Sequence, residues 1–210
     1  EPRLCYPLDT CPMELNTETI TTPPVDAATV VLLRDTEQGL QVLLLRRHQA
    51  SNVLGGAFVF PGGKLDTADQ HPTLLSRLSQ DRQLLQTRLA EPDIASEQAA
   101  GLFVAAIREA FEECRVLLGQ AETGTPDLQA LHAALASGQT WADALQTHNL
   151  LLQTEALVPW SRWITPKQAS VTNKRFDTRF FITQVPPDQT AQHDEHETTE
   201  TLWIGPREAL

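Results

Sequence analysis

The stretch Val104-Ala105-Ala106-Ile107-Arg108-Glu109-Ala110-Phe111-Glu112-Glu113-Cys114-Arg115-Val116-Leu117-Leu118 decides how the rest of the chain is interpreted. Its apolar residues recur at helical spacing, which predicts an amphipathic helix from about 97 to 118. Glu109, Glu112 and Glu113 are three and four residues apart, so their carboxylates share one helix face. Like charges repel there, and a hard divalent cation such as Mg²⁺ would offset the repulsion. The plain alternative is a solvated acidic face.

Composition limits the classes of partner. The chain has 210 residues, which suits one domain with elaborations. Its formal net charge of −11 argues against a nucleic-acid duplex or an anionic membrane as main partner, since both favour a basic surface. No apolar run approaches the roughly 20 residues of a membrane span. The three cysteines, Cys5, Cys11 and Cys114, do not suggest a disulfide scaffold and favour a reducing, cytoplasmic location. A homodimer stays open.

Proline punctuates residues 1–24, which predicts an irregular N-terminal arm before a domain at 25–210. β-Branched apolar runs at 27–33 and 40–47 predict a hairpin, with a polar turn at 34–39. A short strand at 57–60 leads into Pro61-Gly62-Gly63-Lys64, where two glycines allow a sharp turn and close approach to a ligand.

Helical patterns dominate two later segments. Leucines at helical spacing predict one or two helices at about 72–90, within a segment at 66–100, and Ser96 as the cap of the next helix. In the segment at 121–156, Pro126 and Asp127 open a predicted helix, Thr140 caps another, and a third short helical piece is expected at 150–157. Strands are predicted at 157–164, 174–184 and 200–204, with a further helix opening at Pro206.

The Gly-rich turn and the acidic helix together resemble the Nudix hydrolase signature. That signature is Gly, five residues, Glu, seven residues, then Arg-Glu-apolar-any-Glu-Glu-any-Gly-apolar. Its second half matches from Arg108 to Val116. Three departures stand out: 44 residues separate Gly63 from Arg108 where the signature has 13, which indicates an insertion of 31; Ala100 takes the place of the first Glu, with Glu97 one turn away as a substitute; and Arg115 replaces the final Gly, which predicts that the helix continues.

Flanking stretches resemble a Nudix subgroup with such an insertion, the coenzyme A diphosphatase-like members related to the mammalian peroxisomal enzyme. The clearest are Trp163-Ile164-Thr165-Pro166 and Lys174-Arg175-Phe176-Asp177-Thr178-Arg179-Phe180-Phe181. The resemblance implies an α+β fold, the Nudix α/β/α sandwich with a mixed β-sheet, here with helical insertions at 66–100 and 121–156.

The resemblance also implies the site. Glu109, Glu112, Glu113 and the carbonyl of Gly63 would bind Mg²⁺ or Mn²⁺, Arg108 would orient a carboxylate, and Glu197, from a late loop, would act as metal ligand or general base. The candidate substrate contacts are basic residues that could bind phosphates: Arg46, Arg47, Lys64, Arg175 and Arg179. Trp160, Trp163 and Trp203 could stack on a base, although core packing is commoner for tryptophan.

The expected function is hydrolysis of a diphosphate bond in a nucleoside diphosphate derivative, with coenzyme A or its thioesters as preferred substrate. Another nucleotide, such as a dinucleotide, ADP-ribose or a nucleotide sugar, is the alternative substrate. A Nudix-fold module that binds a nucleotide without hydrolysing it also stays open, because Ala100 and Arg115 depart from the signature. The partner in each case is a small nucleotide.

Overall fold

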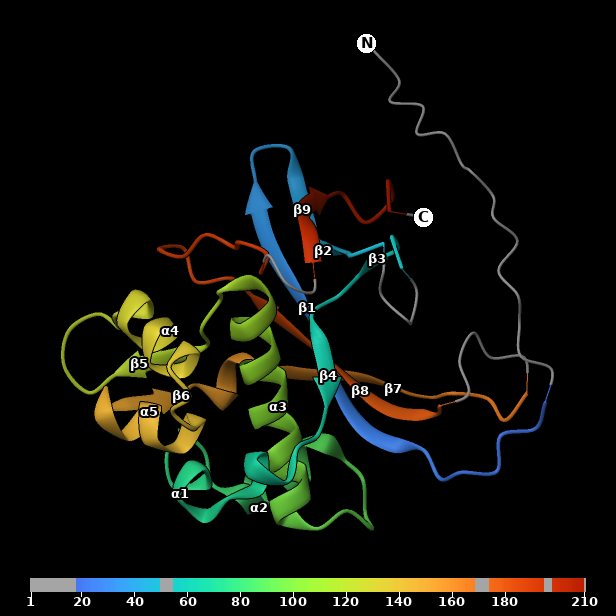
Figure 1. Ribbon diagram of the computed structural model, residues 1–210, viewed down its shortest axis with the longest axis horizontal. Helices are drawn as coiled ribbons and strands as arrows, with labels where there is room; N and C mark the ends of the chain where they lie inside the picture. The colour runs from blue at the N-terminus through green and yellow to red at the C-terminus, as the bar shows by residue number, and fades with distance from the viewer. Residues whose placement is uncertain (1–17, 50–54, 169–173, 195–197, 210) are drawn as a thin grey trace.

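The computed structural model describes residues 18–49, 55–168, 174–194 and 198–209, and shows a mixed sheet beside one long central helix (Figure 1). The strands are β1 (Val25–Thr36), β2 (Gly39–Arg47), β3 (Phe58–Val59), β4 (Gly62–Lys64), β5 (Gly119–Ala121), β6 (Leu150–Leu152), β7 (Val158–Ile164), β8 (Phe176–Gln184) and β9 (Thr198–Ile204). The α-helices are α1 (Pro72–Leu75), α2 (Arg82–Leu89), α3 (Ser96–Cys114), α4 (Leu128–Ala136) and α5 (Trp141–Thr147), and the short 3₁₀ helices are η1 (Thr67–Gln70) and η2 (Thr154–Ala156).

Seven strands form the main sheet. Its order is β3-β2-β1-β8-β7, with β4 also paired to β1 and β9 to β2. Strands β1 and β8 run parallel and the other pairs run antiparallel, so the sheet is mixed. Strand β1 carries buried residues of both parities, such as Val30 and Val31, which is why its sequence is continuously apolar rather than alternating. The predicted mixed α+β fold is confirmed.

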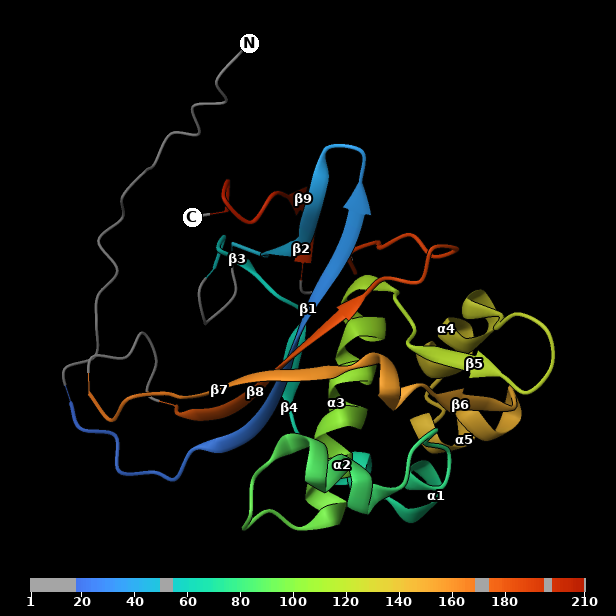
Figure 2. The ribbon, with the colours of Figure 1, turned by 180° about the vertical axis from the view of Figure 1, so that it is seen from behind.

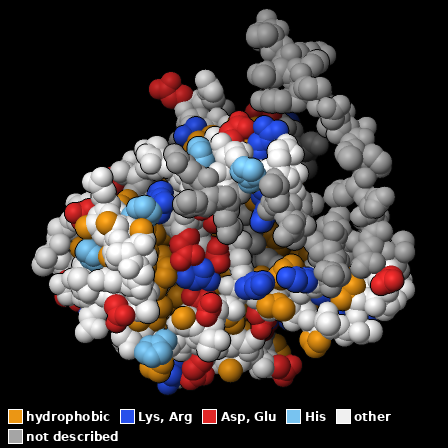
Figure 3. Space-filling model, in the orientation of Figure 1, with side chains coloured by type: hydrophobic (Ala, Val, Ile, Leu, Met, Phe, Trp, Pro, Cys, Tyr) orange, Lys and Arg blue, Asp and Glu red, His pale blue; other side chains and the backbone are white. Residues whose placement is uncertain are grey.

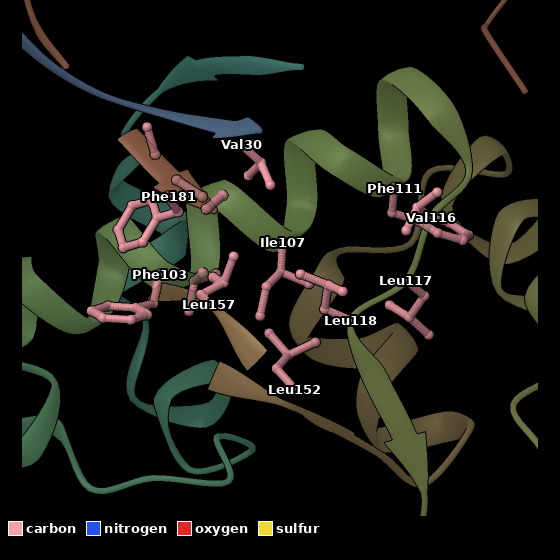
Figure 4. Close-up of a cluster of buried hydrophobic side chains, with 14 of the residues drawn as sticks. Val30, Phe103, Ile107, Phe111, Val116, Leu117, Leu118, Leu152, Leu157 and Phe181 are labelled. Atoms are coloured by element: carbon pink, nitrogen blue, oxygen red, sulfur yellow. The ribbon is translucent and has the colours of Figure 1, made fainter. Parts of the chain in front are cut away.

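Helix α3 organises the core. Its apolar residues pack against β1 and β8, and the Phe103 and Phe181 rings lie 4.8 Å apart (Figure 4). Ile107 and Phe111 extend the same buried stripe toward the helix end, beside Leu118. The view from behind shows β7 and β8 crossing this helix (Figure 2). Because core burial fixes the apolar stripe of α3, it also fixes the direction in which the acidic face points.

The end of α3 differs from the prediction. The helix stops at Cys114, and Arg115 adopts a left-handed conformation with φ of 61°. Its N–H bonds back to the carbonyls of Ala110 and Phe111. Arg115 therefore performs the turn that a glycine normally performs, and the expected continuation to 118 is wrong. At the other end Ala95, rather than Ser96, occupies the cap position.

The leucine-rich segment packs as helix, as predicted. Leu74 of α1 and Leu85 of α2 are fully buried, and α2 lies against α3. Arg88 of α2 donates to the carbonyls of Thr154, at 2.9 Å, and Leu157. The inserted segment is thus tied both to the central helix and to the approach to β7.

The second elaboration contains α4 and α5, capped by the side chains of Asp127 and Thr140 as the sequence indicated. The expected helical piece at 150–157 is instead strand β6 followed by η2. Pairing of β6 with β5 explains the difference, because the apolar Leu150–Leu152 run satisfies its backbone in a two-stranded ladder. After Pro206 the described residues form a turn rather than a helix. Of the predicted arm at 1–24, residues 1–17 lie outside the described ranges, including Cys5 and Cys11.

Candidate active site

Gly62 and Gly63 lie in strand β4, so the sharp turn predicted at this motif is wrong, and the strand lies against the acidic face of α3. Strand β4 pairs with β1 through Gly62 and Thr29, and Gly63 and Ala28. A Cβ on Gly62 would lie 2.6 Å from the Ala28 carbonyl oxygen, and one on Gly63 would overlap the Glu109 carboxylate. A side chain at position 62 would collide with the β1 backbone, and one at position 63 would displace the Glu109 carboxylate, so the two glycines let β4 lie close to β1 and to α3.

The three glutamates of α3 lie on the part of the helix that meets β4 and α5. Glu113 is 8% exposed and accepts a hydrogen bond from the Gly62 N–H at 3.1 Å. Glu112 accepts one from the Trp141 indole N–H, at 2.7 Å, which links the cluster to α5. Arg108 donates to Glu109 at 2.7 Å and to Glu112 at 3.0 Å through the same nitrogen, Nη1. The structure brings the predicted residues together.

Asp69 is the residue of this cluster that the sequence prediction missed. It is 1% exposed, and its two oxygens accept from Arg108 Nε at 2.8 Å and Nη2 at 3.0 Å. The signal was present: counting forward from Gly63, rather than backward from Arg108, puts Asp69 at the place of the signature's first acid. The predicted substitute, Glu97, lies in the first turn of α3, where it instead pairs with Arg82 of α2.

The electrostatics of the cluster favour a cation. Burial raises the pKa of Glu109, and the neighbouring Arg108 only partly opposes this. Burial alone would lower the pKa of Arg108, but its carboxylate partners hold that pKa above the ordinary value. The glutamates also stand near the helix C-terminus, where the helix dipole is negative, and no basic residue of α3 lies in its last turn. Negative charge therefore exceeds what Arg108 offsets.

The late loop docks at the same helix end. The N–H of Gln192 donates to the Cys114 carbonyl at 2.9 Å, and that of Asp194 donates to the Glu113 carbonyl at 3.1 Å. On the other side of the gap, the Thr198 N–H donates to the Asp194 carboxylate. Glu197 itself lies outside the described residues, and its predicted role stays a prediction.

The candidate phosphate contacts fall into two groups. Lys64 ends strand β4 with its side chain exposed, while Arg46 and Arg47 end β2 opposite the start of β9. Arg46 makes a 3.5 Å ion pair with Glu200 at a partly exposed position. Lys64 thus lies beside the two glycines, and Arg46 and Arg47 lie beside the start of β9, which follows the late loop.

Arg175 and Arg179 belong to another part of the molecule. Arg179 is 4% exposed, and its guanidinium makes a two-point contact with Glu91, at 2.7 and 2.9 Å, and an ion pair with Asp26. Arg175 donates to the Thr165 carbonyl at 2.9 Å. Carboxylates occupy the Arg179 donors, which gives this residue a structural use beside the first turn of α3.

The tryptophans differ in exposure and in position. Trp160 and Trp163, on the edge strand β7, are 65% and 62% exposed, so neither serves the core. Trp203 is half-buried, with the Arg34 guanidinium 4.3 Å from the centre of its ring. The tryptophan that borders the acidic cluster is Trp141, which the sequence did not single out.

Comparisons with known proteins identify the family. The family described as the NUDT19 Nudix domain matches residues 19–210. The chain belongs to this Nudix family. Acyl-coenzyme A diphosphatase NUDT19 from Xenopus laevis is 29% identical to this Nudix domain over 204 residues, covering 81% of the chain and 54% of the relative. The human protein of that name is 29% identical over 214 residues, covering 82% and 55%. The chain thus spans about half the length of these relatives.

A solved structure supports the fold. The Nudix hydrolase from Alicyclobacillus acidocaldarius has a TM-score of 0.65 and 28% identity, and the match covers 90% of this Nudix domain and 82% of that chain. In the part of the domain that the structure describes, no helix is both long and apolar enough to cross a membrane.

The donor set of the Nudix domain suits a hard divalent cation, because every candidate ligand is an oxygen: three carboxylates and the Gly63 carbonyl. Within the described ranges, no three acidic, histidine or cysteine side chains are arranged to hold a metal ion. The hydrogen bonds explain this, since Arg108, Trp141 and the Gly62 N–H take up carboxylate oxygens. The chemistry of the ligands fits, and the carboxylates would exchange some of these bonds for a cation.

Proposed function

We propose that this Nudix domain hydrolyses the diphosphate bond of coenzyme A or its acyl thioesters, giving 3′,5′-ADP and (acyl-)4′-phosphopantetheine, with Mg²⁺ or Mn²⁺. The carrying observation is the glutamate cluster of α3, in which Arg108 pairs with both Glu109 and Glu112, and Glu113 accepts the Gly62 N–H of β4. The relatives named acyl-coenzyme A diphosphatases support the choice of substrate.

The chemistry requires little covalent work from the protein. Water attacks one phosphorus, the bridging P–O bond breaks, and the other phosphate leaves. A bound divalent cation offsets charge on the phosphoryl oxygens and lowers the pKa of a water molecule. Catalysis otherwise rests on positioning and electrostatics.

Residues of the chain then take distinct roles. Glu109, Glu112, Glu113 and the Gly63 carbonyl hold the cation, while Arg108 orients the first two carboxylates. Three basic side chains at the ends of β4 and β2 bind phosphate oxygens: Lys64, Arg46 and Arg47. Glu197 accepts the proton of the attacking water. Its loop supports this role, since Asp194 bonds to the Glu113 carbonyl. We leave Arg179 out of these contacts because carboxylates already occupy its donors, and Arg175 because its Nε bonds to the Thr165 carbonyl in the same part of the molecule.

The binding-only alternative loses its two supports. Arg115 turns the helix in place of the signature glycine, and Asp69 supplies the acid that Ala100 does not. Hydrolysis is therefore the better proposal.

A substrate panel tests it. The protein is incubated with coenzyme A, its analogue lacking the 3′-phosphate, ADP-ribose and a dinucleotide, each with Mg²⁺ or Mn²⁺, and the products are identified by mass. We expect coenzyme A to give the two named products faster than the other compounds. If coenzyme A stays intact while ADP-ribose or the dinucleotide is cleaved, the choice of substrate is wrong and only the broader hydrolase proposal survives.

A further inference from the structure

A cleft of about 800 Å³ opens beside the acidic cluster, between the insertion and the α4–α5 segment. Figure 3 shows hydrophobic side chains in the hollow next to adjoining acidic and basic side chains near the middle of this face. Its volume falls within the range of small-molecule binding sites. The walls come from η1 and α1 on one side and from α4, α5 and their connection on the other.

The cleft and the proposed hydrolytic site share a wall. Glu112 and Arg108 line the cleft while they also join the acidic cluster. Trp141 forms part of the same wall, and its indole N–H holds Glu112 at 2.7 Å. A substrate with its diphosphate at the glutamates could therefore extend one of its two halves into the cleft.

The chemistry of the walls selects which half. Three carboxylates other than Glu112 line the cleft, from Asp66, Asp69 and Asp143, and its arginine is already shared by Asp69, Glu109 and Glu112. An anionic group such as the 3′-phosphorylated nucleoside would be repelled there. The cleft is also lined by His71, whose Nδ1 accepts the Thr73 N–H at 3.3 Å. The other lining side chains carry no charge, and they offer apolar surface together with amide and hydroxyl groups, for example from Leu74, Leu135, Trp141, Gln139, Gln146 and Thr140.

We propose that this cleft binds the uncharged, amide-containing arm on the far side of the scissile diphosphate, the pantetheine arm of a coenzyme A substrate. The inference rests on the proposed function for the choice of arm. It assigns a purpose to both elaborations of the fold, because the insertion and the α4–α5 segment supply opposite walls of one subsite.

Filling the cleft tests the assignment. Ala142 is a half-buried lining residue on α5, and Ala142→Trp places an indole in the space. Ala133→Trp is the matched control, since Ala133 is exposed on α4 and does not line the cleft. Pantetheine itself, without any phosphate, is titrated calorimetrically into each protein. We expect wild type and Ala133→Trp to bind it equally, and Ala142→Trp to bind it at least about tenfold more weakly.

Turnover gives the second readout. For coenzyme A, Ala142→Trp should raise KM at least about tenfold. For a truncated substrate in which a methyl group replaces the arm, Ala142→Trp and wild type should have the same kcat/KM. If Ala142→Trp does not fold, as judged by circular dichroism, Leu135→Trp fills the cleft from α4 instead.

The outcomes separate the two proposals. Failure of wild type to cleave any diphosphate substrate would refute the proposed hydrolysis, whereas the pantetheine titration would still decide the cleft assignment. No binding of pantetheine by wild type, or equal binding by Ala142→Trp, would overturn that assignment even if coenzyme A is hydrolysed.

Discussion

Two arginine–carboxylate clusters lie along α3, and they differ in charge balance and in surroundings. Near the helix C-terminus, one guanidinium, that of Arg108, meets Asp69, Glu109 and Glu112, with Glu113 beside them. Near the N-terminus, two guanidiniums meet three carboxylates, in a network of Arg162, Arg179, Asp26, Glu91 and Asp177. The first cluster has a large formal excess of negative charge, and the second is close to balanced.

The surroundings reinforce the difference. The Arg108 cluster borders a cleft and strand β4, and the Glu112 side chain is 43% exposed. The Arg179 cluster joins three strands to the loop before α3, and its central guanidinium is almost fully buried. The hydrogen bond from Arg162 lowers the pKa of Asp177, which keeps that carboxylate charged. The same side-chain types thus form an acidic cluster beside a cleft in one place and an internal brace in the other.

The largest effect we expect is on stability, from the balanced cluster. Arg179→Met leaves Glu91 and Asp26 without their buried partner, so the free energy of unfolding should fall by about 3–5 kcal/mol. Urea unfolding measures the loss. The exposed Arg207→Met is the control and should change stability by less than about 0.5 kcal/mol. If the Arg179→Met protein is as stable as wild type but binds coenzyme A poorly, Arg179 contacts the substrate instead of bracing the fold.

An intermediate effect is expected on catalysis, from the unbalanced cluster. Asp69→Asn keeps the shape of the side chain but removes the charge that fixes Arg108, so Arg108 should orient Glu109 and Glu112 less well. We expect kcat to fall about tenfold to a hundredfold with KM for coenzyme A nearly unchanged. Asp35→Asn is the matched control, because that carboxylate is exposed near the end of β1 and does not line the cleft. Equal kcat for Asp69→Asn and wild type would contradict the positioning role.

The smallest effect we expect is on stability, from Arg115 at the C-terminal end of α3. Arg115 holds a left-handed conformation that costs a non-glycine residue about 1–2 kcal/mol. Arg115→Gly should therefore raise the free energy of unfolding by about 1 kcal/mol. Arg115→Ala keeps the backbone strain and should show no such gain, which separates the backbone effect from loss of the side chain. Thermal unfolding of the two variants would show the difference.

The sequence predicted the elements whose signal is local. The periodicity of α3, the other strands of the main sheet and the caps at Asp127 and Thr140 followed from short-range patterns, whereas β4 was predicted as a turn. The glutamates were found because their spacing alone puts them on one helix face.

What the sequence did not predict depends on tertiary context. The pairing of Arg108 with Asp69 joins residues on either side of a long insertion, so helix periodicity could not reveal it. Arg179 resembled a phosphate contact until its burial against Glu91, from another element, became visible. Arg115 turned the helix without a glycine because neighbouring packing stabilises a conformation that its own preference opposes.

Binding of Mn²⁺ tests the central claim, that the glutamates of α3 hold a divalent cation for hydrolysis. Electron paramagnetic resonance would follow free Mn²⁺ during titration of wild type, Glu112→Gln and, as a control distant from the cluster, Glu122→Gln. We expect wild type and Glu122→Gln to bind Mn²⁺ alike, and Glu112→Gln to bind more weakly and to lose about a hundredfold or more in kcat while staying folded. Equal Mn²⁺ binding and turnover in Glu112→Gln, or full wild-type turnover in excess chelator, would contradict the account.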